Sequence, residues 1–156
     1  MRRKDKNISD EAIIEHILHT ADICRLGLVD KDEAYIVPVN YAYSNGTIII
    51  HSAGNGRKIE IIRQNNKAAF EIEGGYAIET GEKACEWTTK YRSVMGKGII
   101  TIVTNVLQKK AGLDLIMKKY GWSKDEITYD EALLSRVCIL SLNILVKTGK
   151  QSGSWE

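Results

Sequence analysis

The stretch 47–58, Thr-Ile-Ile-Ile-His-Ser-Ala-Gly-Asn-Gly-Arg-Lys, constrains the fold more than any other part of the chain. The run 47–50 is β-branched throughout, which is typical of a largely buried β-strand. The Gly-Asn-Gly triplet at 54–56 interrupts the strand. Isoleucines then follow at 59, 61 and 62, so the spacing predicts a helix over 56–66. A fold that contains this unit must place a helix start directly behind the end of a buried strand.

The start of this helix has the chemistry of a phosphate site. A helix start leaves backbone N–H groups unpaired and carries partial positive charge. Arg57 and Lys58 add a forked guanidinium and a compact ammonium at the same place. Basic residues near a helix start are also common on solvated surfaces, and His51 also suits an ordinary strand position. The spacing alone therefore leaves two interpretations open, a phosphate cradle or a plain basic surface.

Length and charge indicate one globular domain over residues 1–156. The chain is 44% hydrophobic and 27% charged, which excludes a disordered protein. Its 22 basic and 20 acidic residues give a net charge of +2, which does not indicate nucleic acid or an anionic membrane as a partner. No apolar run approaches the roughly 20 residues that a membrane-spanning helix needs. The basic N-terminus lacks the apolar core of a signal peptide, so we expect a cytoplasmic protein.

Three cysteines are scattered along the chain and form no CxxC pair. Cys24 and Cys138 lie in apolar runs, and we expect both to pack as reduced residues in the core. Cys85 lies in a polar region, where we expect exposure. The spacing does not indicate a structural zinc site, and no metal is expected.

Taken in order, the pattern predicts a mainly β, α+β chain of six or seven antiparallel strands with helices inserted between them. Ser9 is a candidate N-cap for the first helix. The single proline, Pro38, marks an edge, a bulge or a ligand-facing break in the second strand. Closure into a barrel is the usual way for such a sheet to remove its edges. We expect strands at 23–29, 34–43, 47–50, 68–73, 84–94, 96–103 and 137–146, helices at 10–21, 56–66, 106–120 and 130–134, a loop at 74–83 and a polar tail at 147–156.

Several short motifs resemble one protein family, with the same order and compatible spacing over nearly the whole chain. The family is the flavin-binding split-barrel group related to pyridoxamine 5'-phosphate oxidase, and the resemblance is greatest to its 5-nitroimidazole-resistance (Nim) branch. The motifs are Leu-Gly-Leu-Val at 26–29, Val-Pro-Val-Asn-Tyr at 37–41, Asn-Gly at 45–46, His-Ser-Ala at 51–53, Gly-Arg-Lys at 56–58, Tyr-Arg-Ser-Val-Met-Gly at 91–96, and Thr-Gly-Lys at 148–150 followed by Trp155.

The resemblance implies a homodimer of split β-barrels with two flavins at the interface. It implies FMN as the cofactor, with FAD as the alternative. It places Arg57 and Lys58 at the phosphate and His51 and Ser52 at the polar edge of the ring. Apolar plates and polar donors complete a flavin site. By motif position, the residues along the isoalloxazine are Val37, Val39 and Asn40, and those that approach the flavin across the interface or line its pocket are Arg92, Ser93 and Val94.

Two classes of function follow from the resemblance. The first is a flavin-dependent oxidoreductase that reduces a small acceptor such as a nitroaromatic compound, with His51 donating a proton or hydrogen bond. The second is a non-catalytic carrier or sensor that binds flavin or haem. Val37 and Val39 also suit a plain sheet core. The tail after Lys150 is short and departs from the family pattern, so the resemblance does not assign it a contact with the flavin. The chain lacks a clear second set of basic residues, so pyridoxamine-phosphate oxidation is not expected either.

Overall fold

The structure is a computed structural model that describes residues 3–123 and 127–155. Within these residues the chain forms seven strands, four α-helices and two short 3₁₀ turns. The strands are β1 (Asn7–Ile8), β2 (Ile23–Asp30), β3 (Glu33–Ser44), β4 (Thr47–Ala53), β5 (Lys67–Glu79), β6 (Thr88–Val103) and β7 (Val137–Ser152). The helices are α1 (Glu11–Thr20), α2 (Arg57–Gln64), α3 (Val106–Lys119) and α4 (Glu131–Arg136), and the 3₁₀ turns are η1 (Lys4–Lys6) and η2 (Ala84–Glu86).

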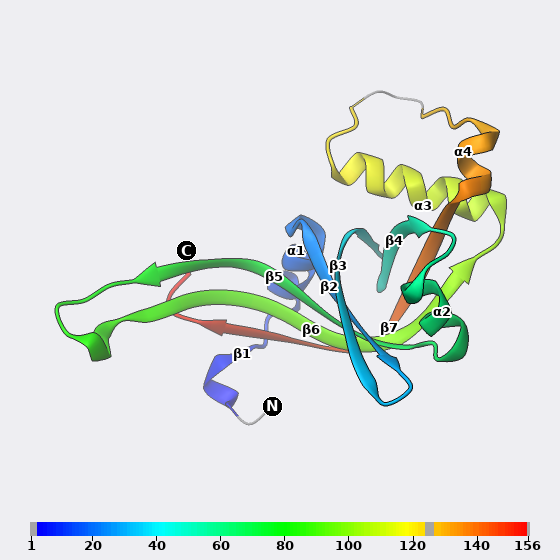
Figure 1. The fold of residues 1–156 in the computed structure, drawn as a ribbon. Coiled ribbons are helices and arrows are strands. Elements are labelled where there is room, and N and C mark those ends of the chain that lie inside the picture. Colours follow the sequence, from blue (N-terminus) through cyan, green and yellow to red (C-terminus); the bar gives the residue numbers. More distant parts are fainter. Residues whose placement is uncertain (1–2, 124–126, 156) are drawn as a thin grey trace.

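The strands form one antiparallel sheet that closes on itself. Their order is β1-β7-β4-β3-β2-β5-β6, and β7 also pairs with β6. Because β7 pairs with both β4 and β6, six strands make a closed barrel and β1 joins its outer edge (Figure 1). The strands β2, β3 and β4 form the expected meander, and the expected mainly β barrel with peripheral helices is confirmed.

The barrel interior is filled by alternate residues of the strands, and α1 closes one end. The Tyr41 hydroxyl donates to the carbonyl of Leu18 at 2.8 Å, and the Tyr43 hydroxyl donates to Glu15 at 2.9 Å. These two bonds attach β3 to α1 from inside the barrel. Fully buried side chains of the interior include Leu26, Ile48, Ile50, Ile59, Ile72, Val94, Ile100, Leu140 and Leu142.

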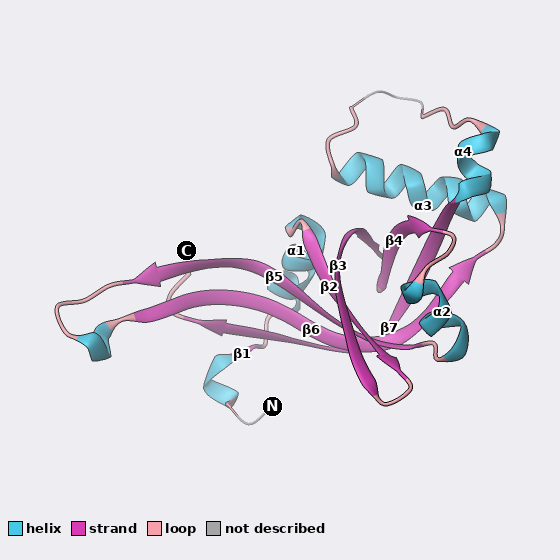
Figure 2. Cartoon of the chain, in the orientation of Figure 1, coloured by secondary structure: helices cyan, strands magenta, loops and turns pink. Residues whose placement is uncertain are grey.

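A second, smaller apolar layer lies outside the barrel. The helices α3 and α4 cover the outer face of β3, β4 and β7 (Figure 2). Asn105 caps α3 by accepting from the amide of Gln108, and Gly121, with φ +101°, follows its last turn. The buried residues of this layer are Ala42, Leu113, Ile116, Leu134 and Ile139.

The strands β5, β6 and β7 continue past the barrel as a long arm (Figure 1). The loop expected at 74–83 is therefore wrong in its first half, because β5 pairs with β6 as far as Glu79. The polar tail expected from residue 147 is also wrong, because β7 pairs with β6 as far as Ser152. The segment 96–103, expected either to continue the strand at 84–94 or to pair with it, continues it as one strand, β6, which begins only after η2.

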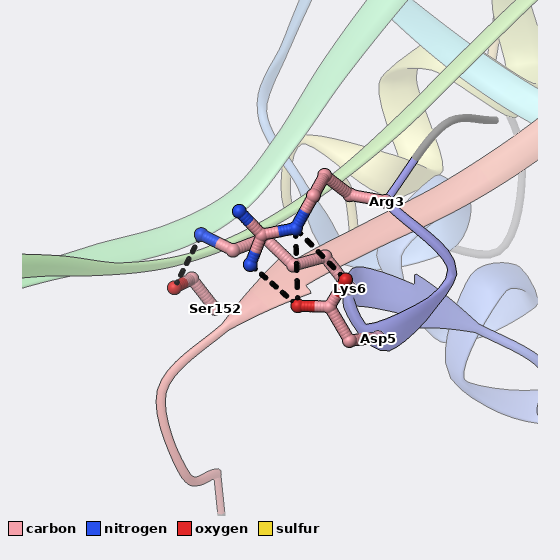
Figure 3. A network of polar contacts seen from close by, with 4 residues as sticks. All are labelled: Arg3, Asp5, Lys6 and Ser152. Carbon is pink, nitrogen blue, oxygen red and sulfur yellow. Dashed lines mark hydrogen bonds and ion pairs between the residues drawn. The ribbon is translucent and has the colours of Figure 1, made fainter.

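The N-terminal segment runs along the end of β7. Asn7 and Ile8 pair with Lys150 and Gly149. Lys6 Nζ donates to the Ser152 hydroxyl at 3.2 Å, beside the exposed pair of Arg3 and Asp5 (Figure 3). The cap of α1 is Asp10, which accepts from the amide of Ala12 at 2.9 Å; the expectation of Ser9 is wrong by one residue.

Among the described residues, no helix has the length and apolar character needed to span a membrane.

Candidate functional site

The junction between β4 and α2 is built as the sequence predicts. Gly56 is the N-cap of α2 and has φ +100°, a conformation that residues with side chains rarely adopt. Its carbonyl accepts from the amides of Ile59 at 2.9 Å and Glu60 at 3.1 Å. No side chain caps this helix end. The first-turn N–H groups of Arg57 and Lys58 are therefore left for an external acceptor.

Arg57 reaches away from its helix to the hairpin that joins β2 and β3. Its Nε donates to Asp30 Oδ2 at 3.0 Å, and its Nη2 donates to Glu33 Oε2 at 3.2 Å. The hydrogen bond that Arg57 donates to Asp30 is the main cause that raises the pKa of Arg57. The guanidinium also lies 5.3 Å from the ring centroid of Tyr35. Two of its three nitrogens are thus used by carboxylates.

Lys58 lies half-buried at the same helix end. Burial lowers the pKa of its ammonium below the usual value. Among the described residues, no carboxylate forms an ion pair with it. The uncapped amides and the Lys58 ammonium are donors that suit a phosphate group, and Arg57, whose third nitrogen bonds to neither carboxylate, lies on the same first turn.

His51 and Ser52 occupy the last part of β4, just before this junction. They pair with Ile139 and Cys138 of β7. Because successive residues of a strand face opposite sides, Ser52 lies on the side of the buried Ile50, and His51 lies on the outer side. The His51 side chain is exposed, and both residues border a hollow of about 450 Å³ that extends to α4.

Val37, Val39 and Asn40 lie on the half of β3 that pairs with β2 alone. In this half Pro38 needs no donor toward β4, which agrees with the expected edge position. Val39 is 8% exposed and belongs to the barrel core, and Val37 packs against the same core. Asn40 faces outward and is exposed. The valine side chains thus serve the core in this chain, and their contact with a ring stays a prediction.

Arg92 and Ser93 lie on β6 in the arm, and Val94 lies where this strand enters the barrel. Arg92 Nε donates to Gln151 Oε1 at 3.1 Å. Val94 is 0% exposed and belongs to the barrel core, so its side chain meets no ligand at the surface. Ser93 is half-buried and borders a hollow of about 400 Å³ on the outer face of the arm.

One chain does not bring the two groups of predicted residues together. His51 pairs with Ile139, and Arg92 pairs with Gln151, twelve residues further along β7. At roughly 3.3 Å per residue, that length of strand measures up to about 40 Å. Figure 1 shows the end of β4 and the arm part of β6 on opposite sides of the molecule. A site that includes both groups therefore needs residues from two copies of the chain.

The C-terminal tail covers the arm near Arg92. The Trp155 indole Nε1 donates to the carbonyl of Ser152 at 3.1 Å. Its ring centroid lies 4.8 Å from the Lys90 ammonium and 4.9 Å from the Arg92 guanidinium. Gly75 lies next to this ring; a Cβ there would make an ordinary contact at 3.5 Å, so it is the φ of +138° that favours glycine at this position. The tail thus packs its Trp155 ring against Lys90 and Arg92 of the arm, a contact that could not be predicted from the sequence.

The sequence analysis also misses the two partners of Arg57. It predicts the segment around Asp30 and Glu33 only as a polar turn. These carboxylates lie 27 and 24 residues before Arg57, and the folding of the β2–β3 hairpin against α2 brings them to it. The acidic residues concentrated at 30–33 are the one feature of the sequence that could have indicated partners for a basic side chain.

No metal site accompanies these residues. Within residues 3–123 and 127–155, no group of three or more His, Cys, Asp or Glu side chains is placed to hold a metal ion. Cys24 and Cys138 are buried and Cys85 is exposed, as expected.

Comparison with known proteins identifies relatives of this chain and its fold. The family model of pyridoxamine 5'-phosphate oxidase matches residues 10–144. A search of curated proteins finds no match. A structure of a candidate 5-nitroimidazole antibiotic resistance protein from Bacteroides thetaiotaomicron is 29% identical, with a TM-score of 0.82 over 93% of this chain and 86% of that chain.

Two further structures share the fold at lower identity. A flavocytochrome from Azotobacter vinelandii is 14% identical, with a TM-score of 0.85 over 99% of this chain and 72% of that chain. An FAD- and haem-binding protein from Mycobacterium smegmatis is 17% identical, with a TM-score of 0.85 over 96% of this chain and 75% of that chain. These two likenesses show the barrel fold.

Proposed function

Because the chain belongs to the pyridoxamine 5'-phosphate oxidase family, we propose that it is a flavin-dependent oxidoreductase that reduces a small acceptor such as a nitroaromatic compound. Its proposed cofactor is FMN, with FAD as the alternative, and its proposed location is the cytoplasm. The observation that carries the proposal is the β4–α2 junction, where uncapped helix amides, Arg57 and Lys58 form a phosphate-binding donor set directly behind His51 and Ser52. The likeness to a candidate nitroimidazole-resistance protein supports the acceptor class.

The division of the predicted residues between two ends of the chain supports a homodimer. The phosphate donors lie at the β4–α2 junction, whereas Arg92 and Ser93 lie on the arm. In the proposed dimer, the arm of one copy reaches the junction of the other, so that Arg92 meets the ligand from the partner side. The apolar side chains of Tyr76 and Ile78 on the arm are 68% and 66% exposed, and burying them against a second copy would be favourable.

The chemistry is divided between the cofactor and the residues of the chain. A bound flavin supplies the electrons that reduce the acceptor. Lys58 and Arg57 hold the phosphate, and Ser52 offers a hydroxyl to the polar edge of the ring. His51 lies beside the hollow and donates a hydrogen bond or a proton to the anion that develops on the acceptor.

Charge reversal of the phosphate donors tests the cofactor site. In the double variant Arg57→Glu, Lys58→Glu, we expect purified protein to lose bound flavin and to fail in reconstitution with FMN. Lys110→Glu with Lys118→Glu is the matched control, since both lysines are exposed on α3 and the charge change is equal. Flavin binding that survives unaltered in the first variant refutes the cradle.

Replacement of His51 separates its catalytic role from a structural one. His51→Ala is expected to lower the reduction rate of a nitroaromatic acceptor by about 100-fold, the lower range for general acid catalysis, while flavin content changes little. Equal losses of rate and flavin content would mean that His51 only supports the cofactor site.

A second function has its own support. The flavocytochrome and the FAD- and haem-binding protein share the fold at a TM-score of 0.85 each. We therefore keep a carrier or sensor that binds flavin or haem without turnover as the alternative. A flavin that stays oxidised with every reduced nicotinamide, or a haem Soret band in the purified protein, favours this alternative.

A further inference from the structure

The hollow beside His51 has the size and lining of a small-molecule site. Its volume of about 450 Å³ falls within the range that small ligands occupy. His51 and Ser52 border it from β4, and Leu133 and Val137 border it from α4 and the start of β7. Leu133 is 47% exposed, so its side chain presents apolar surface to the hollow. The lining therefore offers apolar surface for a planar ring beside the polar side chains of β4.

One cation of this hollow has no carboxylate partner. Arg136 is the last residue of α4 and lines the hollow together with His51. Among the described residues, no acidic side chain forms an ion pair with it. Its backbone carbonyl lies 3.7 Å from the position of a Cβ on Gly54, which places the end of α4 against the β4–α2 bend. Arg136, whose side chain is exposed, therefore borders the hollow next to the β4–α2 bend, and no carboxylate among the described residues is paired with it.

The other charged group of the hollow has a structural task. Asp130 is the N-cap of α4, and its Oδ1 accepts from the amide of Ala132 at 3.0 Å. This bond holds the carboxylate at the helix start, where negative charge is favourable. Asp130 nevertheless opposes an anion in the hollow, so its charge weakens whatever preference Arg136 creates.

We infer that the hollow is the acceptor site and that Arg136 binds an anionic substituent of the acceptor. The protein then prefers small planar aromatic acceptors that carry a carboxylate over neutral acceptors of the same shape. This inference rests on the proposed function. A guanidinium presents paired N–H donors that match the two oxygens of a carboxylate. With the ring on Leu133 and its carboxylate at Arg136, the reducible group of the acceptor faces His51 on β4.

The reaction at this site balances with the cofactor class already proposed. Reduction of a nitro group to a nitroso group takes two electrons and two protons and releases one water molecule. A bound flavin would supply the two electrons and a reduced nicotinamide would restore them, while His51 can donate one proton and solvent the other. Arg136 takes no part in these transfers, since its role is to hold the acceptor.

Two probes of equal shape and different charge test the inference. The probes are 4-nitrobenzoate and 4-nitrobenzamide, and the first measurement is the equilibrium dissociation constant of each on oxidised, flavin-loaded protein, from the change in flavin absorbance. Arg136→Gln is expected to raise the dissociation constant of the nitrobenzoate about fivefold, as for a solvent-accessible charge pair, and to leave that of the nitrobenzamide within about twofold. The KM values under turnover follow the same pattern.

Asp130→Asn gives the opposite change and keeps the fold. Asparagine caps a helix about as well as aspartate, so α4 retains its start. Removing the opposing charge is expected to lower the dissociation constant of the nitrobenzoate about two- to threefold, again with little effect on the nitrobenzamide. Arg63→Gln is the matched control, because Arg63 is exposed on α2 and does not line the hollow.

The outcomes separate this inference from the proposed function. If Arg136→Gln retains flavin but changes both probes equally, or changes neither, the assignment of Arg136 is overturned and the oxidoreductase stands. If the wild-type protein binds both probes equally, the preference is overturned in the same way. If the wild-type protein holds no flavin or reduces neither probe, the proposed function fails as well.

Discussion

Removal of the Asp30 carboxylate is expected to strengthen the binding of FMN. Asp30 accepts a hydrogen bond from Arg57 at 3.0 Å, and Glu33 accepts a second one at 3.2 Å. A phosphate at the start of α2 must compete with these carboxylates for the guanidinium and is repelled by them. Asp30 is the stronger competitor, because its side chain is 26% exposed whereas that of Glu33 is 78% exposed.

The size of the effect follows from the exposure of the group. The Arg57 side chain is 54% exposed, and ion pairs in this setting contribute little because water and salt screen them. We therefore expect Asp30→Asn to lower the dissociation constant of FMN about two- to fivefold at low salt, and less at high salt. Glu33→Gln should give a smaller change in the same direction.

The assay is a titration of flavin-free protein with FMN, followed by the quenching of flavin fluorescence. Asp32→Asn is the matched control, since it removes the same charge from the same turn without a bond to Arg57. A higher dissociation constant for Asp30→Asn would refute the reasoning, because it would mean that Asp30 positions Arg57 for the phosphate. A change equal to that of Asp32→Asn would mean that only the net charge matters.

Three further predictions concern stability. Burial lowers the pKa of Lys119 to about 8, below its usual 10.5. Between these two pH values the unfolded chain binds more protons than the folded one, so the stability of the wild type relative to Lys119→Met should rise with pH. Urea unfolding at pH 7.5 to 9.5 measures this change. Gly98→Ala would place a Cβ 2.0 Å from a backbone carbonyl oxygen of β7 and should lower the free energy of unfolding by about 2 kcal/mol in the same assay. Gly54→Ala is its control and should be near neutral, because its Cβ would meet nothing nearer than 3.7 Å. Lys147→Met removes the cation that bonds to Glu15 between β7 and α1. After solvent screening, this should lower the free energy of unfolding by about 1 kcal/mol, and the Tm should be lower and depend less on salt than that of the wild type.

The sequence predicts the barrel well because its strands carry their own local signals. The β-branched run at 47–50 and the Asn45–Gly46 turn, with φ of 49° and 75°, locate β4 and the hairpin before it. The arm is different. Glycine at 74 looks like a loop residue, yet a Cβ there would lie 2.7 Å from Ile17, so the glycine serves the contact between α1 and β5. That reason lies 57 residues away in the chain and leaves no local signal.

The candidate site divides in the same way. Arg57, Lys58, His51 and Ser52 could be proposed from the sequence because a strand end and a helix start place them together. The carboxylates that hold Arg57 and the position of Arg136 beside His51 could not, since they depend on how the β2–β3 hairpin and α4 pack against the β4–α2 junction. Val39 and Val94 show the converse limit, because a motif position does not tell whether a valine faces the core or a ligand.

The most direct test of the oxidoreductase is an absorbance spectrum of the purified protein, repeated after a reduced nicotinamide is added without oxygen. The account predicts flavin absorbance bands that bleach on addition of the nicotinamide and return when a nitroaromatic acceptor follows. Protein that stays colourless after incubation with FMN and with FAD would contradict it.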